Sequence, residues 1–401
     1  MQVCVQKYGG SSLADTEKID YVAKRILEKV KRGYKLTVVV SANGNTTNRL
    51  IEKAREINSN PGLRELDMLV STGEQMSAAL VTMSLQKLGA SAISVNAFQI
   101  GIKTDSVFSS AKIMTINTNR INRLFTENDV IVVTGFQGIT EENEITTLGR
   151  GGSDTSAVAL AAVLNCDCEI FSDFDGIFSL DPRIRPDAKK LDIITYDEML
   201  EMAKLGANVL HSRAVEIAKK FSVNLRCAST FNDKGGTIVT SDNIEAPVVT
   251  GLSIMKDQIQ ITLSNLPLDA MTNSEIFEVA SKNHMNVDMI SIIQISDHFD
   301  VSFTVIENKV KDVKMAYEEI LEKYRGTEIK TNPGFIKISV VGLGMRTESG
   351  VASRFFKALS KKEITVRMVT TSEIKISALV GKEYLDDAVD CLTEEFSLCI
   401  E

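Results

Sequence analysis

The first 240 residues alternate short apolar runs with longer stretches of helical periodicity, and this alternation constrains the fold more than any other feature. Several of the short runs are apolar throughout, which is typical of strands buried on both faces of a parallel sheet. The longer stretches supply the crossover helices that parallel strands require. We therefore predict an α/β fold whose mostly parallel sheet lies between two layers of helices. The predicted strands are 3–7, 36–41, 92–96, 130–134, 168–172 and 224–227, and the predicted helices include 14–31, 74–88 and 196–205.

A different pattern follows the polar turn segments 232–236 and 242–247, because the chain then repeats a βαββα unit twice. Two such units in tandem predict a pair of ferredoxin-like modules. The second unit ends too soon for a closing strand, whereas 247–254 provides a spare one, so we expect that strand to complete the second module. The predicted domains are residues 1–240, a linker with the spare strand at 241–257, and modules at 258–332 and 333–401. The paired elements of the two modules are the strands 259–263 and 336–340, the helices 273–283 and 349–361, the strands 286–290 and 365–369, the strands 301–306 and 374–380, and the helices 310–324 and 384–396.

The composition narrows the class of partner. The 401 residues carry a formal net charge of -8 and no long block of Lys or Arg, which argues against nucleic acid and anionic membrane surfaces. No apolar run approaches the roughly 20 residues of a membrane span, and the N-terminus begins a strand pattern in place of a signal peptide, so we expect a cytoplasmic protein. Six cysteines are too few for a disulfide scaffold. With three histidines and no second Cys pair beside Cys166 and Cys168, we predict reduced thiols and no metal site.

Residues 147–156 join three glycines, Arg150, Asp154 and several hydroxyls immediately before the apolar helical pattern 157–164. Glycine lets the backbone approach a ligand closely, and the free N–H groups of a helix N-terminus attract anions. Arg150 adds a planar fork suited to a carboxylate or phosphate. The segment predicts an anion-binding turn, and the alternative is an ordinary turn capped by Ser153 or Asp154.

Two further loops follow predicted strands. Lys7 precedes Gly9, Gly10 and Ser11, a composition that can cradle phosphates, although the lysine comes before the glycines and the pattern is not a P-loop. Residues 41–48 form a hydroxyl-rich loop after the next strand. Each loop alone is equally compatible with an ordinary solvent-facing turn. Both lie beyond the carboxyl ends of strands, where ligands of parallel sheets bind.

Taken in order, these loops and their neighbours resemble the aspartate kinase family, and the two C-terminal modules resemble its ACT regulatory pair. The resemblance covers essentially the whole chain. It implies transfer of the γ-phosphoryl group of ATP to the side-chain carboxylate of L-aspartate, which gives 4-phospho-L-aspartate at the entry to diaminopimelate, lysine, threonine and methionine biosynthesis. The segments that carry the resemblance are 7–12, 40–42, 71–74, 135–138, 147–156, 172–176, 181–183, 198–201, 209–213, 286–290 and 371–377.

The resemblance also assigns a site. Lys7 and Asp154 are the implied catalytic residues, with Lys7 on the phosphates and Asp154 organising it. Arg150 would bind the α-carboxylate of aspartate and Glu74 its ammonium, although Glu74 could instead simply open the helix from 74 and compensate its dipole. Mg2+ would accompany the nucleotide. The implied substrate residues are Thr47, Glu74, Arg150, Gly151 and Ser153, and the implied ATP residues are Lys7, Gly9, Gly10, Ser11, Ser41, Ser172, Asp173, Phe178, Asp181, Arg183 and Asn208.

For the C-terminal modules the resemblance implies feedback inhibition by an amino acid, lysine in preference to threonine, and a homodimer formed through the modules. Two alternatives stay open, namely a glutamate or acetylglutamate kinase of the same fold and a non-catalytic amino-acid sensor. Arg150 with Glu74 favours aspartate over the first alternative, and an intact Lys7 argues against the second. The implied effector residues are Met271, Asp288, Ser372 and Glu373.

Overall fold

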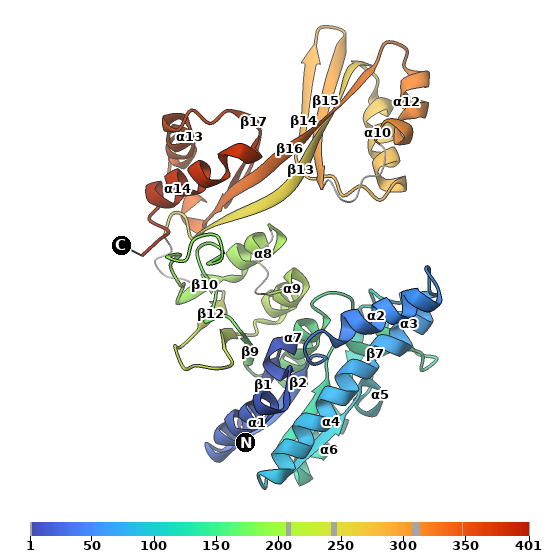
Figure 1. Ribbon diagram of the computed structural model, residues 1–401, viewed down its shortest axis with the longest axis vertical. Coiled ribbons are helices and arrows are strands. Elements are labelled where there is room, and N and C mark those ends of the chain that lie inside the picture. The colour runs from blue at the N-terminus through green and yellow to red at the C-terminus, as the bar shows by residue number, and fades with distance from the viewer. Residues whose placement is uncertain (1, 206–209, 242–246, 307–312, 347, 401) are drawn as a thin grey trace. The chain divides into compact units, whose positions relative to one another are not determined.

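The computed structural model describes residues 2–205, 210–241, 247–306, 313–346 and 348–400, without the side chain of Ala270. The predicted junction at 242–247 lies outside these residues except for Pro247. The contacts define two compact units, drawn in Figure 1. The first comprises Met1–Phe178, Lys190–Lys204 and Asn208–Ile244, and the second comprises Ser179–Lys189, Leu205–Ala207 and Glu245–Glu401.

The segment Ser179–Lys189 falls within the predicted first domain in sequence, yet it packs with the second unit. The Ser179 carbonyl accepts a hydrogen bond of 2.7 Å from the Leu252 N–H, and the Lys189 N–H donates to the Leu398 carbonyl at 3.0 Å. The chain therefore leaves the first unit after Phe178 and returns to it at Lys190.

An eight-stranded sheet forms the centre of the first unit. In spatial order its strands are β10 (Ile193–Thr195), β12 (Thr237–Thr240), β11 (Leu225–Ser229), β9 (Cys168–Ser172), β1 (Gln2–Tyr8), β2 (Tyr34–Val40), β6 (Val130–Thr134) and β3 (Ala92–Val95). Neighbours are parallel except β11 and β12. All six predicted strands lie in this sheet, so the predicted fold class is confirmed. The parallel register brings the carboxyl ends of β1, β2 and β6 to one edge.

Helices cover both faces of this sheet, and their burial follows their sequence periodicity. Helix α1 (Thr16–Lys31) buries Ile19, Val22, Ala23 and Ile26, which lie on one helical face. It packs beside α4 (Thr72–Lys87) in an apolar cluster with β1 and β2. Helix α7 (Gly152–Leu164) packs on the opposite face of β1, and its Ala-rich first three turns are buried on all sides. The other helices are α2 (Thr46–Ile57), α3 (Leu63–Val70), α5 (Ala97–Ile100), α6 (Thr118–Glu127), α8 (Tyr196–Lys204) and α9 (Ser212–Phe221), with a 3-10 turn at Gly10–Leu13.

A small second sheet in the first unit was not predicted. Its strands, in spatial order, are β5 (Ile113–Ile116), β4 (Ile102–Thr104), β7 (Gln137–Ile139) and β8 (Ile145–Thr147). Three of these strands, β4, β7 and β8, have only three residues, which is too short for the pattern that identifies strands in a sequence. A buried hydrogen bond of 2.6 Å between the hydroxyls of Thr104 and Thr146 links β4 to β8. Strand β8 leads directly into the glycine-rich loop 147–151.

The second unit contains a six-stranded sheet. In spatial order its strands are β14 (Ile290–Ile295), β15 (His298–Ile306), β13 (Gly251–Pro267), β16 (Glu328–Val341), β18 (Lys375–Gly381) and β17 (Val366–Ser372), and all neighbours are antiparallel. Residues 251–255 of β13 pair with 337–341 of β16, and 260–264 pair with 328–332. The two modules thus share both central strands.

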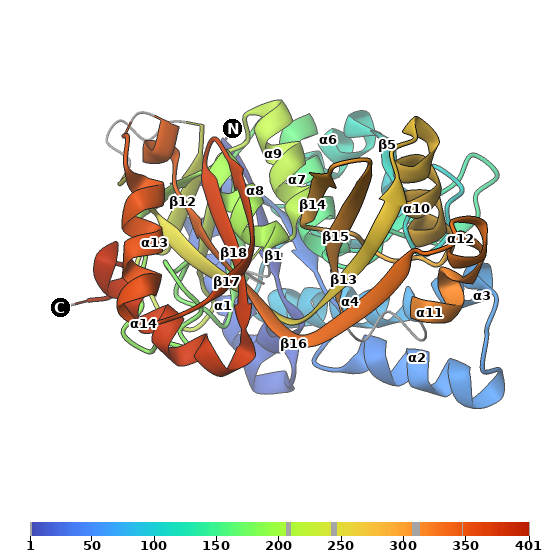
Figure 2. The same ribbon diagram turned by 90° about the horizontal axis from the view of Figure 1, so that it is seen from above.

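Helices lie at the two ends of this sheet. Figures 1 and 2 show β13 and β16 running between the two groups of helices. One group is α10 (Ala270–Lys282), α11 (Val313–Ala316) and α12 (Glu318–Lys323), and the other is α13 (Val351–Lys361) and α14 (Leu385–Glu395), with 3-10 turns at Leu343–Arg346 and Lys382–Tyr384.

The first module departs from the prediction in two places. The strand predicted at 286–290 is wrong, because the edge strand β14 begins at Ile290. The preceding loop is held instead by Asp288, which forms an ion pair with the buried Lys337 of β16. The helix predicted at 310–324 is divided into α11 and α12, which meet at Tyr317, and residues 307–312 lie outside the described part of the chain.

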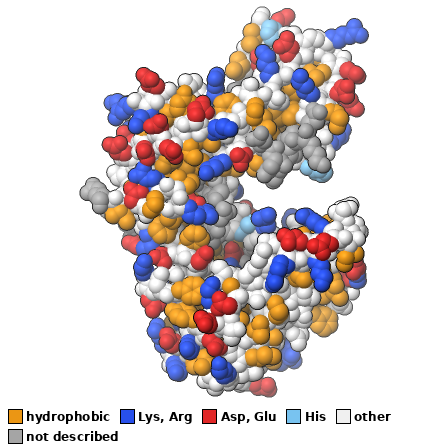
Figure 3. Space-filling view, in the orientation of Figure 1, with side chains coloured by type: hydrophobic (Ala, Val, Ile, Leu, Met, Phe, Trp, Pro, Cys, Tyr) orange, Lys and Arg blue, Asp and Glu red, His pale blue; other side chains and the backbone are white. Residues whose placement is uncertain are grey.

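All six cysteines are free in the structure, and four of them are buried. Desolvation raises the pKa of the Cys4 thiol to about 12 and that of Cys166 to about 11, so both are protonated at neutral pH. Within the described ranges, no helix has both the length and the apolar character to cross a bilayer. Figure 3 shows basic and acidic side chains interspersed over the visible face of each unit.

Candidate functional site

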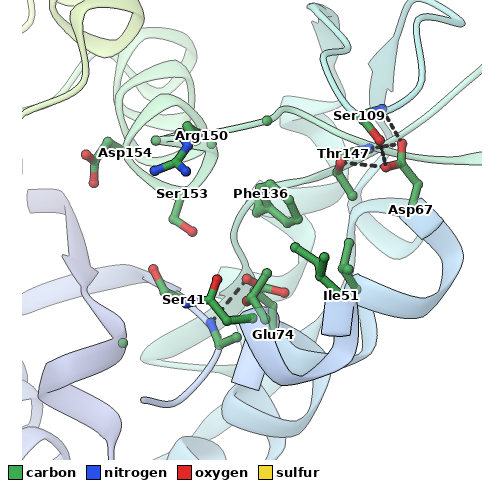
Figure 4. Close-up of a pocket in the computed structure, with 18 of the residues that line it drawn as sticks. Ser41, Ile51, Asp67, Glu74, Ser109, Phe136, Thr147, Arg150, Ser153 and Asp154 are labelled. Carbon is green, nitrogen blue, oxygen red and sulfur yellow. Dashed lines mark hydrogen bonds between the residues drawn. The ribbon is translucent and has the colours of Figure 1, made fainter. Parts of the chain in front are cut away.

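A cavity of about 540 Å³ lies in the first unit where β1, β2 and β6 end. Its walls come from these strand ends, from the loop 147–151 and from the first turns of three helices. Figure 4 shows the side chains that line it. Nine of the predicted site residues meet there, namely Lys7, Gly10, Ser41, Thr47, Glu74, Arg150, Gly151, Ser153 and Asp154.

Three helices begin at this cavity. Thr47 of α2, Glu74 of α4 and Ser153 of α7 line it from the first turn of each helix. In the described structure no side chain caps the N-terminus of these three helices. The Thr46 N–H of α2 and the Gly152 N–H of α7 donate to the carbonyls of Asn43 and Gly149 at 3.2 and 3.0 Å, so the later N–H groups of each first turn and the helix dipoles provide the positive potential. Carboxylates and phosphates suit such a cavity.

Lys7 and Asp154 form an ion pair between the sheet and α7. Lys7 Nζ lies 2.6 Å from Asp154 Oδ1, and both side chains are nearly nine-tenths buried. Asp154 Oδ1 makes no aligned hydrogen bond, so charge attraction fixes the pair. Lys7 faces α7 because successive residues of a strand point to opposite faces, and its neighbour Tyr8 packs in the cluster of α1. The pair places a cation at the strand end.

Arg150 brings a second cation to the cavity. Among the described residues, none forms a hydrogen bond or ion pair with its guanidinium, and the side chain is exposed. Figure 4 shows Arg150 beside Ser153, between Asp154 and Phe136. The next residue, Gly151, has φ of 66°, and a Cβ there would lie 2.2 Å from Cβ of His211, so the turn requires glycine. The unpaired guanidinium can bind a carboxylate by donating two parallel hydrogen bonds to it.

Glu74 contributes a buried carboxylate that is only half satisfied. Its Oε1 accepts a hydrogen bond of 3.1 Å from the Ala42 N–H, whereas Oε2 is buried without a partner in the described structure. Desolvation raises the pKa of Glu74 to about 7. An ammonium group entering the cavity would satisfy Oε2 and favour the ionised form. The alternative role, a carboxylate that only compensates the α4 dipole, leaves this orphan oxygen unexplained.

The predicted nucleotide residues are more dispersed. Gly9, Ser11, Ser172, Asp173 and Phe178 belong to the first unit but do not line the cavity. Asp181 and Arg183 belong to the second unit, where their side chains form an ion pair of 2.6 Å. Asn208 lies outside the described residues. No group of three or more His, Cys, Asp or Glu in the described ranges is arranged to hold a metal ion.

The predicted effector residues are all in the second unit. Met271 is exposed in the first turn of α10, and Asp288 is paired with Lys337. Ser372 and Glu373 lie at the β17–β18 turn, where Glu373 forms an ion pair of 3.0 Å with Arg346. Lys337, which pairs with Asp288, is opposite Leu379 of β18, whereas Ser372 is opposite Lys375 of the same strand. Leu379 and Lys375 are four residues apart, which is roughly 13 Å along a strand. Asp288 and Ser372 are therefore not brought together within one chain.

Sequence reasoning missed one side of the cavity. Asp67 and Ser109 line it with the apolar residues Ile51, Leu66 and Val70. Asp67 lies in a short amphipathic helix, where an acidic residue indicates a solvated face, and Ser109 lies in an irregular loop. Neither had a local signal, because their importance comes from contacts with residues distant in the chain.

Comparisons with known proteins agree with this architecture. The profile of the amino acid kinase family matches residues 2–229, and that of the ACT domain matches 338–396. An aspartokinase of Helicobacter pylori is 42% identical over 402 residues, which cover 98% of this chain and 99% of that protein. E. coli aspartokinase III in complex with aspartate and ADP has a TM-score of 0.81 at 23% identity, covering 99% of this chain and 100% of that one. The same enzyme with lysine and aspartate has a TM-score of 0.78 at the same identity and coverage. At this identity the two structures support the fold.

The buried Glu74 predicts a pH-dependent stability. Because its pKa is about 7 in the fold and 4.5 ordinarily, the folded chain holds this proton more tightly than the unfolded chain does. The stabilising contribution is therefore complete below pH 4.5 and is lost as the pH rises through 7. The shift corresponds to a free energy on the order of 3 kcal/mol.

Urea unfolding of the wild type and of Glu74→Gln at pH 5 and pH 8 measures this contribution. Other carboxylates cancel in the difference between the two proteins. Because only the wild type loses the contribution of protonated Glu74, we expect the stability of Glu74→Gln relative to the wild type to rise between pH 5 and pH 8. An equal difference at both pH values would contradict the raised pKa of Glu74.

Proposed function

The chain belongs to the aspartate kinase family, as its motifs predicted, and we propose that the cavity of its first unit transfers the γ-phosphoryl group of ATP to the side-chain carboxylate of L-aspartate. The observation that carries this proposal is that two groups of opposite charge, the Arg150 guanidinium and Glu74 Oε2, line one cavity with Lys7 and have no partner among the described residues. An α-amino acid presents the complementary pair, a carboxylate and an ammonium. The product, 4-phospho-L-aspartate, would enter lysine, threonine and methionine biosynthesis.

In the proposed complex, Arg150 binds the α-carboxylate of aspartate and Glu74 accepts from its ammonium. Thr47, Gly151 and Ser153 supply polar neighbours from the first turns of α2 and α7. The second carboxylate of the substrate would then point to Lys7, where the uncapped helix N-termini compensate its charge. This arrangement explains why one small cavity holds both charge signs.

The reaction needs no general base, because the attacking carboxylate is ionised at neutral pH. Catalysis therefore consists of alignment and neutralisation of charge on the transferred group. Lys7 is the proposed donor to the phosphate oxygens. Asp154 is the proposed positioning partner of Lys7, since their ion pair of 2.6 Å fixes the ammonium at the end of β1.

The nucleotide is the less defined partner. We propose that Gly9, Gly10, Ser11 and Ser41 surround its phosphates and that the further contacts are those implied by the family. Mg2+ would arrive with ATP and be held mainly by phosphate oxygens and water. The further proposed contacts are Ser172, Asp173, Phe178, Asp181, Arg183 and Asn208.

The activity is tested by supplying ATP and Mg2+ with aspartate, glutamate or acetylglutamate and trapping any acyl phosphate as a hydroxamate. We expect product with aspartate only. Lys7→Ala should lower kcat by about 10²–10³, the usual loss for one donor to developing charge. Lys35→Ala is a matched control, because Lys35 forms a surface ion pair with Asp129 at the start of β2. No product with aspartate, or normal turnover by Lys7→Ala, would reject the respective assignment.

We further propose that the second unit binds an inhibitory amino acid, lysine in preference to threonine, through Asp288 with Met271, Ser372 and Glu373. Asp288 supports this proposal because it already binds an ammonium, that of Lys337. An effector ammonium would have to compete with Lys337 for the same carboxylate. Since Asp288 and Ser372 are separated within one chain, the contacts of a single effector would come from two copies.

The competition predicts that Lys337→Met lowers the lysine concentration for half-maximal inhibition, because it frees Asp288. Lys330→Met, which removes an exposed lysine from the same strand, should leave that concentration unchanged. The measurement is the hydroxamate assay with lysine, threonine and both. If none of the three conditions inhibits the wild type, the effector proposal is wrong.

A homodimer through the ACT modules is the proposed assembly. The edge strand β14 supports it, because Ile290, Ile292, Ile293 and Ile295 are 45–58% exposed on a strand with an unpaired edge. Exposed apolar edges of this kind pair with another chain unless charges protect them. A second copy of β14 would cover both the side chains and the edge.

We expect Ile293→Lys to shift the protein from dimer to monomer in analytical ultracentrifugation, because a charge on the edge opposes pairing. Val369→Lys is the control, since Val369 is exposed on β17 at the other edge of the same sheet. A monomeric wild type, or an Ile293→Lys variant that remains dimeric, would contradict the proposed interface.

A further inference from the structure

Residues 109–111 and residues 147–149, which immediately precede Arg150, form two short segments that lie side by side. The Ala111 N–H donates to the Thr147 carbonyl at 2.9 Å, while the Leu148 N–H donates outside this pair of segments, to the Phe136 carbonyl at 2.9 Å. At the next residue the segments touch, because a Cβ on Gly149 would lie 2.9 Å from the Ser109 carbonyl oxygen. The backbone position of Arg150 therefore depends on how firmly these two segments are joined.

Asp67 joins the segments from one side. This fully buried carboxylate in the second turn of α3 accepts four hydrogen bonds, two from Ser109 and two from Thr147. Oδ1 takes the two hydroxyls at 2.8 and 2.7 Å, and Oδ2 takes the two N–H groups at 2.7 and 2.8 Å. Figure 4 shows Asp67 between the two residues. These four hydrogen bonds use the full accepting capacity of the carboxylate, and no cation among the described residues pairs with it.

Arg213 joins the same segments through their carbonyl groups. Its Nη1 donates to the Leu148 carbonyl at 2.9 Å and its Nη2 donates to the Ala111 carbonyl at 2.6 Å. The planar fork of a guanidinium spans two acceptors that a lysine ammonium could not hold in the same geometry. Arg213 belongs to the motif 209–213, to which the proposed reaction assigned no role.

We infer that Asp67 and Arg213 are positioning residues that hold the loop of Arg150 for the α-carboxylate of the amino-acid substrate. The inference rests on the role proposed for Arg150. Asp67 binds donors of the two segments and Arg213 binds their acceptors, so the two charges together fix both the distance and the register of the segments. Substrate affinity, more than the phosphoryl-transfer step at Lys7, depends on this clamp.

The inference predicts a loss specific to aspartate. Asp67→Asn removes the negative charge and one of the two acceptor oxygens, so the side chain can no longer accept from all four donors, and Arg213→Lys retains the charge without the fork. Each should raise the KM for aspartate on the order of tenfold or more, because small displacements of a positioning group have effects of that size or larger. The KM for ATP should stay within about twofold. Calorimetric titration with aspartate should show the same loss of affinity without turnover.

A structural role is separated from a positioning role by two comparisons. Glu198→Gln alters another fully buried carboxylate that binds a threonine N–H and hydroxyl, on α8 and outside the cavity, so it should leave the KM for aspartate unchanged. In an Arg150→Ala background, Asp67→Asn and Arg213→Lys should raise that KM no further, because positions that act through one residue are not additive.

The outcomes distinguish the two proposals. If Arg150→Ala raises the KM for aspartate but Asp67→Asn and Arg213→Lys do not, the clamp is wrong and the role of Arg150 stands. Additive effects with Arg150→Ala, or equal increases in both KM values, also overturn the clamp. If Arg150→Ala has no effect on the KM for aspartate, the role of Arg150 fails and the inference fails with it.

Discussion

The parallel alignment of β1, β2 and β6 is the constraint on which the rest of the first unit depends. Their register brings three strand ends to one edge, and the first turns of α2, α4 and α7 lie at the cavity there. The backbone itself then supplies much of the positive potential for an anionic ligand. Few basic side chains are needed, and Lys7 and Arg150, the two that line the cavity, determine where the negative groups of the ligand bind.

The same cavity contains groups that the fold leaves unsatisfied. The buried Glu74 Oε2 has no partner, and the Arg150 guanidinium is unpaired among the described residues. The buried Glu74 Oε2 lowers stability, because a polar atom removed from water without a hydrogen bond is unfavourable, whereas the exposed Arg150 guanidinium stays accessible to water. A functional site is where such local costs are expected. Asp67 is as buried as Glu74, but all its hydrogen bonds are made within the protein. We therefore interpret Glu74 as a ligand-binding group and Asp67 as a group that positions the loops.

The part of this structure that is readable from sequence is the part encoded locally. Apolar runs identified the six main strands, and glycines beside charges identified Lys7 and Arg150, because a strand or a turn is specified by adjacent residues. Asp67 and Arg213 were not identifiable in this way, since their partners Thr147 and Ala111 lie 80 and 102 residues away in the chain. Asp288 illustrates the same limit, because this predicted effector residue is paired with Lys337, 49 residues distant. The short strands β4, β5, β7 and β8 depend on one another and lack any periodic signal.

The strands β13 and β16 run through both halves of the second unit, and this has a consequence for how the two modules can vary. Removing β14 and β15 would leave residues 258–267 of β13 without a neighbour on one side, and removing β17 and β18 would do the same to residues 335–341 of β16, so neither half is a separable folding unit. A substitution that alters the twist of β13 or β16 in one module therefore also changes the geometry of the same strands in the other module. The sequence contains two copies of the repeat, but because the copies share both long strands, a substitution in one copy also affects the other.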